Sequence, residues 1–244
     1  MRSRTGDAVI PDHFVWFVWS SVFLVPWLAL FYWKPRSRRE MLWASIFTAP
    51  YGLSERLFVP AYWNPPSLFD LAQRTGFDIE SVVFCFGIGG VAAVLYSVFT
   101  GREAYPMEKR ERRMPLHRHH YLALACPFVA FTILYFLPWN PIYAGIAAMA
   151  VGAVATLLCR PDLKRKTWVG GSLFLGYYVA FLFGLKLTAP GYIGRVWNLS
   201  GLSGFVPAGL PVEELLFAFC FGMYWSGVYE HFTWRRAERA GDGR

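Results

Sequence analysis

Two short acidic sequences open apolar segments of the chain and could transfer protons inside a membrane. One is Pro211-Val-Glu213-Glu214, and the other is Asp78-Ile-Glu80, which begins 133 residues earlier. A charged side chain at mid-depth in a bilayer costs about 2.5–3.5 kcal/mol, so the few that occur usually face a cavity and have a function. General acid–base catalysis needs one protonated and one ionised carboxyl. We therefore treat Glu80, Glu213 and Glu214 as candidate catalytic residues, with capping of helix N-termini as the alternative for each.

The segments around these acids are two copies of one unit. The matched positions are Glu80 and Glu213, Phe84 and Phe217, Phe86 and Phe219, Gly89 and Gly222, Tyr96 and Tyr229, and Phe99 and Phe232. Further matches lie upstream, namely Trp33-Lys34-Pro35 with Cys159-Arg160-Pro161, Gly52-Leu53 with Gly184-Leu185, Arg56 with Lys186, and Trp63-Asn64 with Trp197-Asn198. The repeat predicts that the two acidic helices occupy equivalent places in the fold.

Composition indicates an integral membrane protein. The 244 residues are 55% hydrophobic and only 16% charged. Several apolar runs approach the ~20 residues that a helix needs to cross a bilayer. We expect seven membrane-spanning helices, at residues 13–33, 41–60, 79–100, 119–138, 141–159, 167–188 and 209–231.

The basic residues predict the orientation of these spans. Of the 24 lysines and arginines, 18 follow the first, third, fifth and seventh spans, and six lie on the other side. Cytoplasmic loops collect Lys and Arg, so the N-terminus is expected outside and the C-terminus in the cytoplasm, with the protein integral to the cytoplasmic (inner) membrane. The formal charge of +8 is thus assigned to topology and to contact with membrane lipids, and no nucleic-acid partner is expected.

The repeat and the spans together predict an all-α architecture of two parallel three-helix repeats joined by a linker helix. The units lie four spans apart, so both insert with the same orientation. The expected segments are an N-terminal extracytoplasmic segment (1–12), a first repeat (13–100), a basic cytoplasmic loop with the linker helix (101–140), a second repeat (141–232) and a basic cytoplasmic tail (233–244).

Aromatic residues make up 19% of the chain and favour a cavity that can stabilise a cation. Ring faces attract positive charge without reacting with it. The candidates that follow the acids on the same helices are Phe84, Phe217, Phe221 and Trp225. Arg56 and Lys186, which the repeat pairs, are candidate charge partners for the carboxylates, and snorkelling to the headgroups is their alternative role.

We expect no metal site in this chain. The four cysteines stand singly in apolar segments without CxxC spacing, which indicates neither a disulfide framework nor a zinc site. His117, His119 and His120 lie in the basic loop before the fourth span, where a solvated cluster at the membrane surface is expected instead of a set of metal ligands.

Several motifs resemble the membrane-embedded lycopene cyclase family, which occurs as two small subunits or as one fused chain. They are Pro211-Val-Glu213-Glu214 followed by Leu-Leu-Phe217, Tyr51-Gly-Leu-Ser-Glu-Arg-Leu-Phe58, Tyr62-Trp-Asn-Pro-Pro-Ser-Leu-Phe69 and Phe77-Asp-Ile-Glu80. The resemblance runs from about His13 to His231 and agrees with a fused two-subunit origin. The first copy departs from it, because Asp78-Ile-Glu80-Ser81 lacks the proline and the second acid.

The resemblance implies cyclisation of the end group of a linear carotenoid such as lycopene, without net redox chemistry and without a cofactor. Glu213 or Glu80 would protonate the terminal alkene, and Glu214 would remove a proton after ring closure. The enzyme would be an isomerase of the intramolecular lyase type, with a lipophilic carotenoid or other isoprenoid as its substrate. The ring type, the number of ends cyclised, and a homo-oligomer or association with other carotenoid enzymes remain open.

Two other classes of membrane protein have parallel or seven-helix architectures. A transporter that couples solute movement to protons at the glutamates is the alternative, although the acids lie near one end of their helices and not at the midplane. A retinal protein is excluded because the seventh span has no lysine for a Schiff base.

Overall fold

A computed structural model describes residues 10–239. The first nine residues of the expected extracytoplasmic segment and the last five of the basic tail lie outside the described part. The helices, with η denoting a 3-10 helix, are α1 (Asp12–Val22), α2 (Leu24–Trp33), η1 (Pro35–Ser37), α3 (Arg38–Thr48), η2 (Ala49–Leu57), η3 (Leu68–Asp70), α4 (Leu71–Thr75), α5 (Ile79–Thr100), α6 (Lys109–Arg112), η4 (Pro115–His117), α7 (His120–Tyr135), α8 (Pro141–Cys159), η5 (Pro161–Leu163), α9 (Lys164–Thr188), α10 (Tyr192–Val196), η6 (Leu199–Gly201), η7 (Pro207–Gly209) and α11 (Val212–Thr233).

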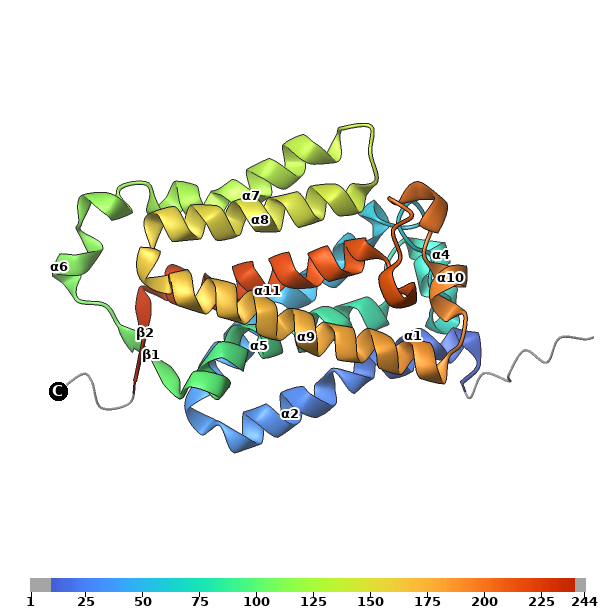
Figure 1. The fold of residues 1–244 in the computed structure, drawn as a ribbon, viewed down its shortest axis with the longest axis horizontal. Coiled ribbons are helices and arrows are strands. Elements are labelled where there is room, and N and C mark those ends of the chain that lie inside the picture. Colours follow the sequence, from blue (N-terminus) through green and yellow to red (C-terminus); the bar gives the residue numbers. More distant parts are fainter. Residues whose placement is uncertain (1–9, 240–244) are drawn as a thin grey trace, which may run out of the picture.

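The long helices lie along the longest axis of the molecule (Figure 1). In this view α7 and α8 form one side, α1 and α2 the other, and α5, α9 and α11 lie between them. The short helices α4 and α10 are at one end, and α6 with the strands is at the opposite end (Figure 1). We call these the α4/α10 end and the strand end.

Within residues 10–239, four helical stretches are long and apolar enough to cross a membrane: Asp12–Trp33, Ile79–Thr100, Pro141–Cys159 and Pro161–Thr188. The expected helical class is therefore confirmed, and four of the expected spans coincide with candidate membrane-spanning helices. The expected spans 41–60, 119–138 and 209–231 are not among the four. Their helices α3 and α7 have 11 and 16 residues, and α11 carries three glutamates.

Prolines explain where two expected spans depart from straight helices. The first is interrupted at Phe23, between α1 and α2, three residues before Pro26, whose nitrogen cannot donate a helical hydrogen bond. In the second, α3 ends at Thr48, and Pro50 lies in the 3-10 helix η2 that follows. The segment η2 packs so closely on α5 that only a glycine fits at position 52. A Cβ atom at Gly52 would lie 2.4 Å from the backbone nitrogen of Val82.

At the strand end, the basic loop and the basic tail pair with each other. Strands β1 (Arg102–Pro106) and β2 (Arg235–Arg239) form a two-stranded antiparallel sheet. The residues expected to be a loop and a tail are therefore partly extended chain. A strand this short, rich in charge and without apolar alternation, has no sequence pattern that identifies it.

The prediction that His117, His119 and His120 form a solvated cluster is wrong for two of the three residues. His117 and His120 are buried, 8% and 3% exposed, and only His119 is exposed. The Nδ1 atoms of both buried rings lie against the thiol of Cys159 at the end of α8. The loop folds back onto the bundle instead of projecting into solvent.

The loops at the α4/α10 end meet at Trp63 and Trp197, which form an isolated antiparallel bridge. The Asn64 backbone nitrogen donates to the Val196 carbonyl at 2.8 Å, and the Asn198 nitrogen donates to the Tyr62 carbonyl at 2.9 Å. The repeat had matched Trp63-Asn64 with Trp197-Asn198, so equivalent loops of the two copies contact each other.

A buried ion network joins α3, α9 and α11. The Lys166 ammonium donates to Glu40 Oε1 at 2.8 Å and to Glu230 Oε1, and all three side chains are buried. Arg160, also buried, donates to both carboxylate oxygens of Asp162 at 2.8 and 2.6 Å. Lys166 and Arg160 are among the 18 basic residues assigned to cytoplasmic loops from the sequence, but both lie inside the structure.

Replacing Lys166 by methionine should destabilise the bundle strongly, because two buried carboxylates would lose their cation. Breaking a buried ion pair in this way typically costs about 3–5 kcal/mol. We expect a lower thermal unfolding midpoint for K166M in detergent. The matched control is K164M, since Lys164 is exposed two residues earlier. Equal midpoints for the two variants would contradict a structural role for the network.

Candidate functional site

A cavity of about 390 Å³ lies inside the helix bundle. Its wall includes side chains of α1, η2, α5, α7, α8, α9 and α11. Both copies of the repeat thus contribute to one chamber. The wall is mostly apolar, and its two carboxyl side chains are Glu55 and Glu214.

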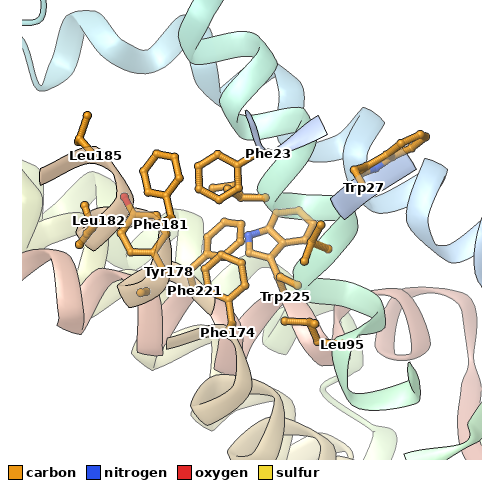
Figure 2. Packing of buried hydrophobic residues seen from close by; sticks show 14 of the residues in the cluster. Phe23, Trp27, Leu95, Phe174, Tyr178, Phe181, Leu182, Leu185, Phe221 and Trp225 are labelled. Carbon is orange, nitrogen blue, oxygen red and sulfur yellow. The ribbon is translucent and has the colours of Figure 1, made fainter. Parts of the chain in front are cut away.

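The four aromatic residues proposed from the sequence all line this cavity, namely Phe84, Phe217, Phe221 and Trp225. On α11 the rings follow one another at four-residue intervals, with centroids 5.6 Å apart for Phe217 and Phe221 and 5.9 Å for Phe221 and Trp225. This spacing places them on one face of the helix. In Figure 2, Phe221 and Trp225 lie with Tyr178 and other rings in the middle of the bundle.

Glu214 is buried in the first turn of α11, where it lines the cavity. Its Oε2 accepts a hydrogen bond from the Tyr178 hydroxyl at 2.7 Å. Its Oε1 accepts from the Trp197 indole nitrogen at 2.8 Å and from the Tyr62 hydroxyl. Three donors thus satisfy both oxygens of this carboxyl inside an apolar wall.

The backbone bridge between the loops positions two of these donors. Tyr62 directly precedes Trp63, and Trp197 is the other half of the bridge. The Trp197 indole nitrogen also donates to the Tyr62 hydroxyl oxygen at 3.1 Å. The third donor, Tyr178, comes from the middle of α9. The environment of Glu214 therefore depends on both loops and on α9.

Glu55 reaches the cavity from η2 and is surrounded differently. Its side chain is buried and lies beside Asp78 and Ser81 at the start of α5. Neither carboxyl oxygen has a hydrogen-bond partner among the described residues. The close packing of Gly52 on Val82 brings this segment to α5. Glu55 was not selected from the sequence, although it lies in the stretch Tyr51 to Phe58 that resembles the cyclase family.

Glu80 and Glu213 do not line the cavity. Each is buried at the start of its helix and accepts a hydrogen bond from the backbone of the preceding loop. Glu80 Oε1 accepts from the Leu68 nitrogen at 2.7 Å, and Glu213 Oε1 accepts from the Ser203 nitrogen at 2.8 Å. Glu213 also accepts from the Tyr143 hydroxyl at 2.7 Å.

Arg56 and Lys186, expected as charge partners, form no ion pair within residues 10–239. The Lys186 ammonium donates to the Ala208 carbonyl at 2.7 Å. The alkyl stem of Arg56 packs against Gly76, where a Cβ atom would lie 2.9 Å from Cγ. Both residues therefore contact the loop that precedes an acidic helix.

The donors to Glu214 were missed by sequence reasoning. Tyr62 and Trp197 were noted as members of loops, and Tyr178 was one tyrosine among the 13 of the chain. A hydroxyl or indole donor carries no spacing signal when its acceptor lies 17, 36 or 152 residues away. The repeat offered the one available indication, because it matched Trp197 with Trp63.

The cavity can support proton transfer to and from an apolar molecule. It offers two carboxyls in contrasting surroundings and a wall of aromatic rings that stabilises positive charge. Among residues 10–239, the side chains placed to bind a metal ion form a separate group outside this wall, namely His120, Cys159 and His231.

Comparison with known proteins identifies a family model that matches part of the chain. Residues 140–232 match the family model described as lycopene cyclase, a range that extends from the residue before α8 nearly to the end of α11 and contains Glu213 and Glu214. No curated protein and no solved structure matches the chain. The match of residues 140–232 confirms the resemblance for this part of the chain and supports its assignment to the lycopene cyclase family.

Proposed function

We propose that this protein closes the end group of a linear carotenoid such as lycopene into a six-membered ring by acid-initiated isomerisation. The observation that carries the proposal is the pair of carboxyls, Glu55 and Glu214, on the wall of one aromatic cavity. The family match supports carotenoid cyclisation independently of this geometry.

The surroundings of the two carboxyls suggest their roles. Glu55 accepts no hydrogen bond from the described residues and lies beside the Asp78 carboxyl, conditions under which a buried carboxyl is stabilised as the neutral acid. Glu214 has three donors, which stabilise the carboxylate. Glu55 is thus the proposed proton donor and Glu214 the proposed base.

The reaction then proceeds without any oxidant. The Glu55 proton adds to the terminal alkene and leaves a tertiary cation, which the neighbouring double bond attacks to close the ring. Glu214 accepts a proton from a carbon next to the new cationic centre, and a ring alkene forms. Product and substrate have the same formula, so the enzyme is an isomerase of the intramolecular lyase type. The rings of Phe217, Phe221 and Trp225 stabilise the cation between these steps.

Glu80 and Glu213 receive a different role from the one expected from the sequence. Each carboxylate accepts a backbone hydrogen bond from the loop before its helix. We assign them to holding these loops, including the Ser203 region near the Trp197 loop, in the position that the Glu214 donors require. They are positioning residues and not the proton donor.

The membrane arrangement in the proposal is the expected one, with seven spans in two parallel repeats, the N-terminus outside and the C-terminus in the cytoplasm of the inner membrane. One contact supports it, because the repeat matches Trp63 with Trp197 and these two residues form a backbone bridge. Matched positions can touch where they lie near an axis that relates the two copies.

A lipophilic substrate would enter the cavity from the bilayer. Part of the wall is formed by Phe58 of the segment after η2 and by Phe128 and Phe131 of α7, and Phe128 is 54% exposed on the outside of the bundle. The cavity thus reaches the lipid-facing side between η2 and α7. No observation in the described residues favours the transporter alternative.

The carboxyl roles can be tested by expressing the chain in a host that accumulates lycopene and separating the pigments by chromatography. Removing a general acid or base typically costs about 100- to 10,000-fold in rate. We expect E55Q and E214Q to abolish detectable cyclic product at unchanged membrane levels. E80Q and E213Q should lose less, because the glutamine carbonyl still accepts the loop hydrogen bond.

The control is E108Q, since Glu108 is exposed at the strand end and far from the cavity wall. Retained cyclisation in E55Q together with its loss in E213Q or E80Q would return the donor role to the residues expected from the sequence. A well-expressed wild type that leaves lycopene unchanged would refute lycopene as the substrate.

The aromatic wall gives a second test. Replacing Trp225 by leucine keeps an apolar side chain but removes a ring face, and a cation–π contact is worth about 0.5–2 kcal/mol. We expect W225L to slow cyclisation by about 2- to 30-fold. W168L is the matched control, because Trp168 is half exposed on α9 and outside the cavity wall. Equal rates for the two variants would argue against cation stabilisation by the ring.

A further inference from the structure

Four side chains with metal-binding atoms converge at the strand end of the bundle, away from the cavity. His117 belongs to η4, His120 begins α7, Cys159 ends α8, and His231 lies in the last turn of α11. All four are buried. None of them lines the cavity or enters the reaction described above.

The distances among these atoms fit a tetrahedral metal site. The Cys159 sulfur lies 3.6 Å from His120 Nδ1 and 3.7 Å from His117 Nδ1. The ligand atoms of His120, Cys159 and His231 all lie within 4.8 Å of one another. A tetrahedral zinc ion with Zn–S of about 2.3 Å and Zn–N of about 2.0–2.1 Å places its sulfur and nitrogen ligands about 3.6 Å apart.

His231 supplies an independent observation. Its side chain is 1% exposed, and its Nε2 has no hydrogen-bond partner among the described residues. Its Nδ1 lies 3.1 Å from the Thr156 hydroxyl oxygen, a contact that orients the ring and leaves Nε2 as the nitrogen that could bind a metal. A buried imidazole nitrogen without a partner is costly, and a bound cation removes this cost.

The surroundings hold the ligands in place. The His120 ring stacks on Trp234, with centroids 3.9 Å apart and planes inclined by 21°. The buried cation Arg160, which directly follows Cys159, is paired with the Asp162 carboxylate. A divalent ion beside one thiolate would therefore not face an uncompensated positive charge.

We propose that His120, Cys159 and His231 bind a divalent transition metal of the zinc type, with the His117 ring beside the same thiol. Thiolate and imidazole together select such ions over magnesium or calcium. The three ligands are buried and lie outside the cavity wall, so we assign the ion a structural role. The ion would join α7, α8 and α11 at the strand end, and this goes beyond the proposed cyclase function.

The site can be tested on the full chain, purified in detergent with an affinity tag that lacks histidine and without chelators. Elemental analysis of the wild type should give about one zinc per chain, and C159S and H231Q should lose most of it. The matched controls are C126S and H119Q, which remove a cysteine and a histidine outside the cluster and should keep the wild-type content.

Cobalt substitution keeps the test decisive if a variant fails to fold. Wild-type protein stripped of metal and loaded with Co²⁺ should show thiolate-to-cobalt charge-transfer absorption and bind one equivalent. A wild type that contains no metal and takes up neither Zn²⁺ nor Co²⁺ would overturn the proposal. Folded C159S and H231Q that hold as much metal as the wild type would also overturn it.

Discussion

The structure depends on the need to satisfy the Glu214 carboxylate inside an apolar bundle. Its three hydrogen-bond donors come from the loop after η2, from the loop after α10, and from the middle of α9. An unpaired buried charge is far more costly than any single packing contact. The bridge between Trp63 and Trp197 therefore links folding to chemistry, because only the assembled loops bring Tyr62 and the Trp197 indole to this carboxylate. The role of base that we propose for Glu214 rests on the same three donors.

The buried polar groups of the molecule lie toward the two opposite ends of the helix bundle. The buried ions of Lys166, Glu40 and Glu230 and the histidine–cysteine cluster join helices toward the strand end. The loops and the starts of α5 and α11 carry the carboxyls toward the α4/α10 end. Aromatic rings cluster in the hydrophobic core of the bundle (Figure 2). A substrate cation formed next to Glu55 would thus meet ring faces and one carboxylate, and few groups that could capture it.

Much of this arrangement follows from helical spacing. Glu214, Phe217, Phe221 and Trp225 stand on one helix at intervals that place them on one face, and all four line the cavity. Glu55 could not be selected in the same way, because it lies in a 3-10 helix after Pro50 and no periodic pattern marks its direction. The pairing of β1 with β2 and the approach of His231 to Cys159 join segments more than 70 residues apart. Such contacts are set by tertiary packing, so spacing rules designed for CxxC or HxxxH motifs do not detect them.

The central claim is that ring closure begins with a proton from the protein. The most direct measurement is a single turnover of lycopene with excess enzyme previously equilibrated in D₂O, followed by mass spectrometry of the cyclic product. A solvent-exchangeable carboxyl adds one proton to the substrate for each ring, while a different, carbon-bound proton leaves. The account predicts one deuterium per ring closed, on ring carbon. A cyclic product without deuterium would contradict acid initiation by a carboxyl of this cavity.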